Sequence, residues 1–273
     1  MLSYDDHIAV AVSGGKDSLT LLNILVKLER KFPRSKLTAI SVDEGIEGYR
    51  DEALGLAAKE CKRLNVKQVI VSYKDLFETT TDEIVTRDLG KAPCSYCGVL
   101  RRKAVNKGAS MVGATKIATG HNLDDEVQTV LLNMLHGDLL RIVRSGPLLR
   151  DLHGKFVTRI KPLCDIPEKE VVFYAYLNGL DFQSIACPHA EAALRNDIRA
   201  FLNNMEQKHP GIKFTLQQTS EKLRELVKIG NAIQLNACEK CGDPTPHQYC
   251  EACLMLQAIA ECRPRSVPGL YHN

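Results

Sequence analysis

The feature that most constrains the fold of this chain is a glycine-rich loop between an apolar run and a helix-like run. The apolar run covers residues 7–12, the helical pattern covers residues 19–30, and the loop between them is Ser13, Gly14, Gly15, Lys16, Asp17 and Ser18. Such a turn cradles a phosphate, because glycines let the backbone approach an anion and the helix N-terminus presents unpaired N–H groups. The lysine charge and the serine hydroxyls add donors, so we expect a nucleotide-binding loop.

The loop differs from a Walker A loop, whose spacing is Gly-x-x-x-x-Gly-Lys-Ser/Thr. An ordinary Gly-Gly turn is the simplest alternative, but six consecutive positions and their strand-helix context fit a phosphate cradle. Ser-Gly-Gly-x-Asp-Ser at this point resembles the PP-loop of ATP pyrophosphatases. The resemblance implies that ATP is cleaved between its α and β phosphates and that an oxygen of the substrate is adenylated.

Apolar, β-rich runs alternate with helix-period runs in the first half of the chain. The pattern predicts strands over residues 7–12, 37–42, 67–72 and 116–119. It predicts helices over residues 19–30, 50–64, 97–110, 124–135, 167–179, 190–207 and 214–229, with Gly230 as the last stop. Strands that alternate with helices favour an α/β fold with a mostly parallel, doubly wound sheet. Ligands on such sheets bind beyond the carboxyl ends of the strands.

A second marked segment follows the last predicted strand and opens a helix. It contains Gly120, His121, Asp124 and Asp125. Paired carboxylates beside a triphosphate are suited to holding Mg²⁺, although a plain acidic helix start would have the same sequence. PP-loop enzymes that modify tRNA carry a similar Gly-His-x-x-Asp-Asp segment. By the same resemblance, Asp43 at the end of the second strand would contact the adenosine.

Charge and hydropathy limit the classes of function. The net charge of +3 is weak evidence for nucleic acid, but basic residues cluster at Arg101, Arg102, Lys103 and Lys107 and again at Arg141, Arg144 and Arg150. Each cluster would bind RNA or simply form a solvated helix face. No apolar stretch is long enough to span a bilayer, and the acidic N-terminus lacks the apolar core of a signal peptide. We therefore expect a cytoplasmic protein without a membrane partner.

The ten cysteines fall into patterned and isolated positions. Without a signal peptide, closely spaced cysteines indicate metal binding or catalysis more than disulfides. Cys94 and Cys97 begin the basic helix, where thiol pKa values are lowered, and Cys187 opens a later predicted helix. The three thiols would converge on one site, or they would be an inert pair and a buried cysteine. The unpatterned cysteines, interpreted as structural or incidental, are Cys61, Cys164 and Cys262.

Two Cys-x-x-Cys knuckles near the C-terminus predict a zinc module. They are separated by eight turn-rich residues, and their cysteines are Cys238, Cys241, Cys250 and Cys253. Four thiolates suit a tetrahedral structural Zn²⁺ site, with two disulfides as the alternative and His247 as a spare ligand. The composition shift predicts a thiolation domain over residues 1–235, a zinc finger over residues 236–256 and a tail over residues 257–273.

Taken in order, the PP-loop, the Cys94–Cys97 pair, the Gly120–Asp125 segment and Cys187 resemble the tRNA 2-thiolation family, the TtcA/TtuA group, on its 2-thiouridine side. The resemblance implies a 4Fe-4S cluster held by the three cysteines, with one iron open to a sulfide. A persulfide on one of these cysteines is the competing possibility. The resemblance also implies a homodimer, and a ubiquitin-like thiocarboxylate carrier or sulfide as sulfur donor.

The implied reaction begins with ATP on the loop, with Mg²⁺ near Asp124 or Asp125, and with Lys16 and Arg101 balancing the phosphate charge. The C2 oxygen of an unstacked tRNA uridine, in the wobble position or the T-loop, attacks the α-phosphate, and sulfur then expels AMP. Cytidine 2-thiolation is the nearest alternative. A tRNA-lysidine synthetase would not need the three cysteines, and a zinc-dependent tRNA-binding scaffold would not need an intact loop.

Overall fold

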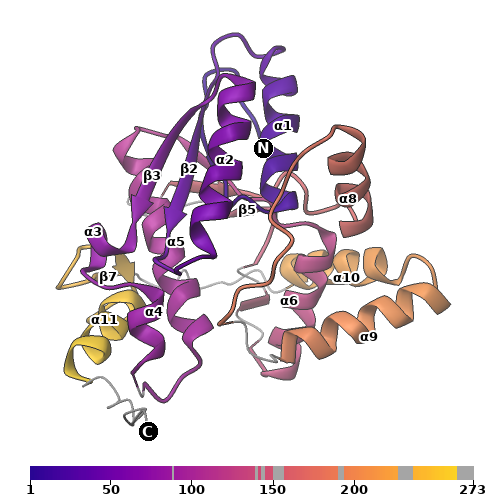
Figure 1. The fold of residues 1–273 in the computed structure, drawn as a ribbon. Coiled ribbons are helices and arrows are strands. Elements are labelled where there is room, and N and C mark those ends of the chain that lie inside the picture. The colour runs from indigo at the N-terminus through magenta and orange to yellow at the C-terminus, as the bar shows by residue number, and fades with distance from the viewer. Residues whose placement is uncertain are drawn as a thin grey trace, which may run out of the picture.

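The computed structural model describes residues 1–87, 89–138, 141–142, 145–149, 157–189, 194–226 and 236–262. Its centre is a six-stranded sheet in the order β3-β2-β1-β4-β6-β5 (Figure 1). The strands are β1 (His7–Ala11), β2 (Lys36–Asp43), β3 (Lys67–Ser72), β4 (Lys116–Ala118), β5 (Leu148–Leu149) and β6 (Thr158–Ile160). All neighbours are parallel except β5, which runs antiparallel to β6. The expected α/β fold with a mostly parallel sheet is confirmed.

Strand β1 lies between β2 and β4, and the chain changes direction across the sheet at this point. The connection from β1 leads to β2 on one side, whereas β4 returns to the other side of β1. Such a switch point opens a crevice at the carboxyl ends of the two strands. The PP-loop follows β1 and the segment with Gly120 follows β4, so both lie at this crevice.

Alternation along the central strands divides the core between the two faces of the sheet. Ile8 and Val10 face one side, where they pack with α1 (Lys16–Glu29), α2 (Arg50–Leu64) and α8 (Glu168–Leu177). Ala9 and Ile117 face the other side, where they pack against α5 (Pro93–Met111). Burial of both faces explains why β1 reads as an almost continuous apolar run.

Three further helices form a separate layer beyond the crevice (Figure 1). They are α6 (Leu123–Leu135), α9 (Leu194–Lys208) and α10 (Ile212–Leu226). Leu123 and Val127 of α6 share a small apolar cluster with Ile198 and Leu202 of α9. The predicted helix start at residue 190 and the predicted stop at Gly230 lie outside the described residues, as do Arg144 and Arg150.

Several elements were not expected from the sequence. Two short helices, α3 (Tyr73–Phe77) and α4 (Thr81–Val85), precede α5, and β5 and β6 extend the sheet. The cysteine-rich segment contains β7 (Asn236–Ala237), β8 (Pro244–Thr245) and α11 (Glu251–Glu261). Met255 and Ile259 of α11 pack in the same apolar cluster as α5, so this segment lies on the core. The division of the chain at residues 235 and 256 stays a prediction.

Two of the unpatterned cysteines are packing residues. Cys61 of α2 and Cys164 lie in the interior of the described structure, with 2% and 1% of their surface exposed. Burial raises the pKa of Cys61 to about 11 and that of Cys164 to about 12, so both stay protonated thiols at neutral pH. Neither is suited to nucleophilic chemistry.

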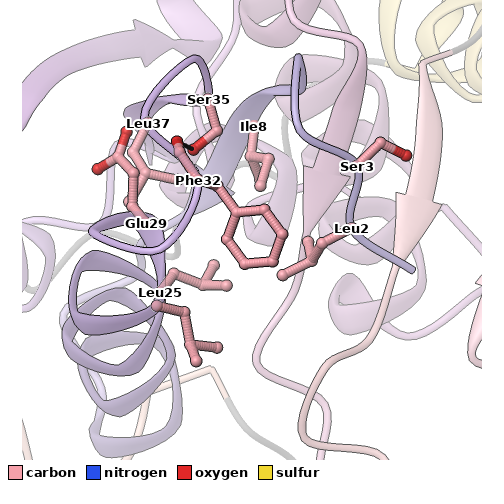
Figure 2. A pocket seen from close by; sticks show the side chains of 9 residues that line it. Leu2, Ser3, Ile8, Leu25, Glu29, Phe32, Ser35 and Leu37 are labelled. Carbon is pink, nitrogen blue, oxygen red and sulfur yellow. Dashed lines mark hydrogen bonds between the residues drawn. The ribbon is translucent and has the colours of Figure 1, made fainter.

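A small pocket lies at the amino ends of the strands, between α1 and the N-terminal segment (Figure 2). Leu2, Ile8, Leu25 and Phe32 supply most of its apolar lining. Its volume is about 10 Å³, which admits at most one water molecule. This pocket is a packing defect and lies at the opposite end of β1 from the PP-loop. In the part of the chain that the structure describes, no helix combines the length and apolar character needed to cross a bilayer.

Candidate nucleotide and sulfur site

The PP-loop is shaped by glycines and by Ser18. Gly14 has a φ of +89°, and a Cβ there would lie 2.3 Å from the carbonyl oxygen of Ala53. Ser18 Oγ accepts the Ser13 N–H at 3.1 Å and donates to the Gly15 carbonyl at 2.9 Å. The loop is therefore held open by one serine, and a larger residue at position 14 is excluded by both backbone strain and overlap.

Gly120 fits the loop from the neighbouring strand. A Cβ on Gly120 would lie 2.9 Å from the carbonyl carbon of Asp17 and 3.0 Å from the backbone nitrogen of Ser18. Because these are backbone atoms, they have no freedom to move aside without displacing the loop. The two glycine-containing segments that the sequence singled out therefore touch each other at the switch point of the sheet.

Lys16 is held between two carboxylates. Its Nζ lies 3.0 Å from Asp17 Oδ2 and 2.8 Å from Glu168 Oε1. Burial alone would lower the pKa of Lys16, but Glu168 and Asp17 raise it above its ordinary value, so the side chain stays charged. Glu168 begins α8 and was missed by the sequence analysis, because an acidic residue after a proline is common at helix starts.

The two adjacent aspartates have different roles. Asp124 accepts the Glu168 N–H at 2.8 Å and forms an ion pair with Lys213 of α10, and the aspartate and lysine side chains are 7% and 10% exposed. Asp125 instead forms a capping box with Asn122. Burial, together with the nearby Asp17 and Glu168 carboxylates, raises the pKa of Asp125 although Asn122 and Arg195 oppose the shift.

Carboxylate groups therefore gather at the loop, where Asp125 lies near Asp17 and Glu168. Asn122 Nδ2 donates to Asp17 Oδ1 at 3.0 Å, which joins the helix start to the loop. Arg195 forms a long ion pair with Asp125, in which Nη1 lies 3.8 Å from Oδ1. Carboxylate oxygens in this arrangement fit Mg²⁺, and Asp125 is better placed for it than Asp124, because the buried Lys213 already neutralises Asp124. The magnesium assignment itself stays a prediction.

His121 is a neutral ring beside the loop. Its Nδ1 lies 2.9 Å from Thr119 Oγ1. Although part of the side chain is exposed, the protein packed around the ring and the charge of Lys161 lower its pKa to about 4. Lys161 itself pairs with Glu126 at 2.6 Å in the interior. The ring can therefore donate or accept a hydrogen bond at neutral pH without adding charge to the nucleotide site.

The end of β2 carries a buried acid that the sequence analysis missed. Asp43, the expected adenosine contact, accepts the Gly45 N–H at 2.9 Å and shapes the turn. Next to it, Glu44 is buried and pairs with Arg50 at 2.7 Å and with Arg101 at 2.6 Å. Arg101 was expected at the phosphates, but the structure places its guanidinium at Glu44 and Cys97. The sequence signal for Glu44 was weak because acids at strand ends are common.

Helix α5 begins at Pro93, so Cys94 and Cys97 occupy its first two turns, as expected. Cys97 is buried, and Arg101 Nη2 donates to its Sγ at 3.2 Å. Tyr73 donates to the Cys97 carbonyl at 2.7 Å. The Cys97 sulfur thus lies near the helix N-terminus, beside a guanidinium group. Cys97 is therefore placed for metal ligation or sulfur chemistry.

Cys187 reaches this region from far along the chain. Cys94 Sγ donates to the carbonyl of His189 at 3.5 Å, and His189 Nε2 lies 2.6 Å from Asp82 Oδ1. Burial and the nearby Cys187 raise the pKa of Tyr49, the residue before α2. The segment with Cys187 therefore lies against the start of α5, and all three thiols are free. Free thiols from two segments fit the ligand set of an iron–sulfur cluster.

The four C-terminal cysteines form a tight set. Their sulfur atoms all lie within 4.8 Å of one another, and among the described residues no other such group of His, Cys, Asp or Glu was found. A four-iron cluster is larger than one ion, so the thiolates of a cluster need not meet as closely. None of the ten cysteines forms a disulfide, and His247 lies outside the set. The four thiolates fit a closed, structural Zn²⁺ site.

The four C-terminal cysteines are connected to α5, the helix that carries Cys94 and Cys97. Lys103 of α5 donates to Cys241 Sγ at 3.2 Å and pairs with Asp243. On the other side, Arg87 donates to the carbonyl of Cys262 at 2.7 Å, at the end of α11. Cys262, read as incidental, thus contributes its backbone to this contact. The cysteine-rich segment therefore packs against α5.

Comparisons with known proteins place the chain in a family. The model of the PP-loop domain family matches residues 3–206. The tRNA 2-thiolation protein NcsA of Haloferax volcanii is 38% identical over 261 residues, which cover 92% of this chain and 81% of that protein. The cytoplasmic tRNA 2-thiolation protein 1 of Aspergillus niger is 35% identical, over 96% of this chain and 76% of that protein.

A solved structure also matches over most of its length. It is the U34-tRNA thiolase NcsA from Methanococcus maripaludis with its [4Fe-4S] cluster, at a TM-score of 0.81 and 36% sequence identity. The match covers 93% of this chain and 80% of that chain. The loop at the switch point, helix α5 and the segment that carries Cys187 all lie within residues 3–206, which the PP-loop domain model matches.

Proposed function

The chain belongs to the PP-loop family of tRNA 2-thiolation proteins, and from this membership we propose that it is an ATP-dependent tRNA uridine 2-sulfurtransferase. One observation supports the proposal most strongly: the phosphate loop and the thiol of Cys97 lie at opposite ends of one chain of contacts through Arg50, Glu44 and Arg101. A nucleotide site beside reactive thiols suits activation of a tRNA base with ATP, followed by transfer of sulfur to that base. A tRNA-binding scaffold without catalysis would need neither the nucleotide site nor the thiols.

The first half-reaction uses the loop and the acids around it. The β and γ phosphates bind at the loop N–H groups and Lys16, and Asp125 with Asp17 would hold the Mg²⁺ that offsets the phosphate charge. The uridine leaves its stack and its C2 oxygen attacks the α-phosphate, so a C–O–P bond forms and pyrophosphate departs. Neutral His121 adds a hydrogen bond near the reacting groups without repelling or attracting the leaving anion.

The second half-reaction takes place at the start of α5. Cys94, Cys97 and Cys187 would hold a [4Fe-4S] cluster, which supplies one iron without a protein ligand that can present a sulfide. Sulfur bonds to C2, the C2–O bond breaks and AMP leaves with the oxygen. Arg101 keeps a positive charge beside Cys97 at 3.2 Å during this transfer. The alternative carrier is a persulfide on one of the three cysteines, loaded from a donor that already holds persulfide sulfur. Its outer sulfur bonds to C2 as AMP leaves, and a second cysteine of the set then attacks the S–S bond, which breaks as the two cysteines form a disulfide.

The comparisons narrow the target. Because the relative from Methanococcus maripaludis is described as a U34-tRNA thiolase, we propose the wobble uridine in place of the T-loop uridine or a cytidine. The names of relatives also favour a cytoplasmic location. Zn²⁺ at the four C-terminal cysteines would be structural. We also propose that the sulfur donor is a ubiquitin-like thiocarboxylate carrier or free sulfide and that the protein is a homodimer. The proposed domain limits are at residues 235 and 256.

The test uses anaerobically reconstituted protein, an unmodified tRNA transcript, ATP, Mg²⁺ and sulfide. Nucleosides and mapped oligonucleotides are then analysed by mass spectrometry. We expect 2-thiouridine at position 34 and stoichiometric pyrophosphate. Thiolated cytidine would move the protein to the cytidine branch, and thiolation in the T-loop would refute the wobble assignment. Absence of both thiolation and pyrophosphate would favour the scaffold.

A further inference from the structure

Glu44 is a buried carboxylate shared by two arginines. Its side chain is 4% exposed, and each of its oxygens has a different partner: Oε2 lies 2.7 Å from Arg50 and Oε1 lies 2.6 Å from Arg101. A buried carboxylate is costly unless it is paired, and here two cations offset that cost. The arrangement therefore requires all three side chains to be present.

Each arginine continues into a different half of the site. Arg50 Nη1 donates to the carbonyl of Ser13 at 2.7 Å, which is the first residue of the PP-loop, and its Nε donates to the Val42 carbonyl at 2.6 Å. Arg101 Nη2 donates to Cys97 Sγ at 3.2 Å. Glu44 is thus the central member of a path from the phosphate loop to the sulfur-site cysteine.

The two arginines differ in how firmly the protein holds them. The Arg50 side chain is 6% exposed and has two backbone acceptors besides Glu44. The Arg101 side chain is 50% exposed, and within the described residues its other polar contact is the Cys97 thiol. Loss of the carboxylate would therefore leave Arg50 near its present place, whereas Arg101 would be free to turn toward solvent.

We propose that Glu44 is a positioning residue that couples the nucleotide loop to Cys97, so that occupation of the loop orders the start of α5. The inference rests on the proposed function, because it takes the loop as the ATP site and Cys97 as part of the sulfur site. Glu44 Oε1 pairs with Arg101, and Oε2 lies 2.7 Å from Arg50 in an ion pair without a hydrogen bond, because the Arg50 Nε hydrogen goes to Val42. A shift of the Ser13 carbonyl on phosphate binding is therefore passed to Arg101 through the attraction of Arg50 for this carboxylate. Activation of the base and delivery of sulfur are thereby linked.

The test is hydrogen–deuterium exchange on the zinc- and cluster-loaded protein, with and without a non-hydrolysable ATP analogue and Mg²⁺. In the parent, the analogue is expected to slow exchange both at residues 13–18 and at the first two turns of α5. In Glu44→Gln, which keeps the shape but removes the charge, protection of the loop is expected to remain while protection of α5 is lost. Glu60→Gln is the matched control, since Glu60 also pairs with an arginine in a buried position on α2, away from the site.

Kinetics supply a second measurement. Glu44→Gln should lower kcat for thiolation about tenfold or more, a usual size for coupling between sites, while KM for ATP changes little. If Glu44→Gln does not fold, Arg101→Gln removes the other end of the path from a half-exposed position and should lose the same protection. Arg101→Lys keeps the charge and should restore part of it.

The outcomes separate this inference from the proposed function. Protection of α5 that survives in Glu44→Gln and Arg101→Gln, or that is missing in a parent whose loop is protected, overturns the coupling and leaves the ATP site intact. A parent whose loop gains no protection from the analogue overturns the nucleotide assignment and the coupling together. An equal loss of α5 protection in Glu60→Gln would show that removing any buried charge has this effect. That result would also overturn the proposed coupling.

Discussion

The pairing of Lys213 with Asp124 gives a sharp test of how the α9–α10 layer is attached to the site. Lys213 of α10 pairs with Asp124 at the start of α6 and donates to Asn203 Oδ1 at 2.7 Å. Replacing it as Lys213→Met keeps most of the side-chain volume. Among the described residues, the Asp124 carboxylate would then be buried with the Glu168 N–H as its one close donor. The variant therefore tests one charge.

The expected decrease in the free energy of unfolding follows from this buried ion pair. Breaking a buried ion pair by removing one partner costs about 3–5 kcal/mol in the free energy of unfolding, which is roughly a hundredfold to a few-thousandfold in the unfolding equilibrium. The double variant Lys213→Met/Asp124→Asn should recover most of this loss, because no buried charge is left unpaired. The coupling energy of the double-mutant cycle then reports the pair itself.

Urea denaturation of the zinc-loaded protein, followed by circular dichroism, measures the change. The control is Lys59→Met, which removes one member of an exposed pair with Asp181, where the side chains are 70% and 62% exposed. We expect no resolvable change for that control, since solvent screens exposed charges. A loss below about 1 kcal/mol for Lys213→Met, or no recovery in the double variant, would refute the reasoning.

Three further predictions concern the reaction and its pH dependence. Asp125→Ala should abolish ATP-dependent release of pyrophosphate while zinc content is unchanged; normal release would remove Asp125 from the adenylation site. Cys187→Ser should spare pyrophosphate release but lower the iron content and stop thiolation, and thiolation at the parent rate would exclude Cys187. His121 should titrate near pH 4 in an NMR experiment, because its pKa is lowered to about 4 from an ordinary value of 6.5. The folded state then binds fewer protons than the unfolded state, so stability falls as pH decreases from about 6.5 toward 4, and His121→Gln should flatten that dependence; a titration near 6.5 would contradict it.

The order of elements around the nucleotide site was predictable from local patterns. Residues 7–12 and 116–119 read as buried strands, and each is followed by glycine and a helix start. Parallel strands place their carboxyl ends at one edge, so the approach of Gly120 to the PP-loop followed from topology. The four C-terminal cysteines form one tight set, as predicted, and Cys94 and Cys97 lie at the start of α5, although this helix begins four residues before the predicted range 97–110.

Other features could not be read from the chain, because they depend on partners that are distant in sequence. Asp124 and Asp125 look equivalent, but Lys213 neutralises the first and leaves the second at the loop. Glu168 approaches Lys16 across more than 150 positions, and neither residue type is unusual in its local setting. The position of Arg101 at Cys97 was likewise decided by the buried Glu44 and not by the phosphates.

The sequence by itself determined the chemistry that the protein has available: a glycine loop after a buried strand, acids at a helix start and seven patterned cysteines. These depend on short spacings, which set backbone shape and ligand identity locally. Only the tertiary structure decided which charges face each other. Burial makes an unpaired charge costly, so Glu44, Asp124 and Lys16 each take the partner that folding brings within reach, and that choice is made by the packing of whole elements.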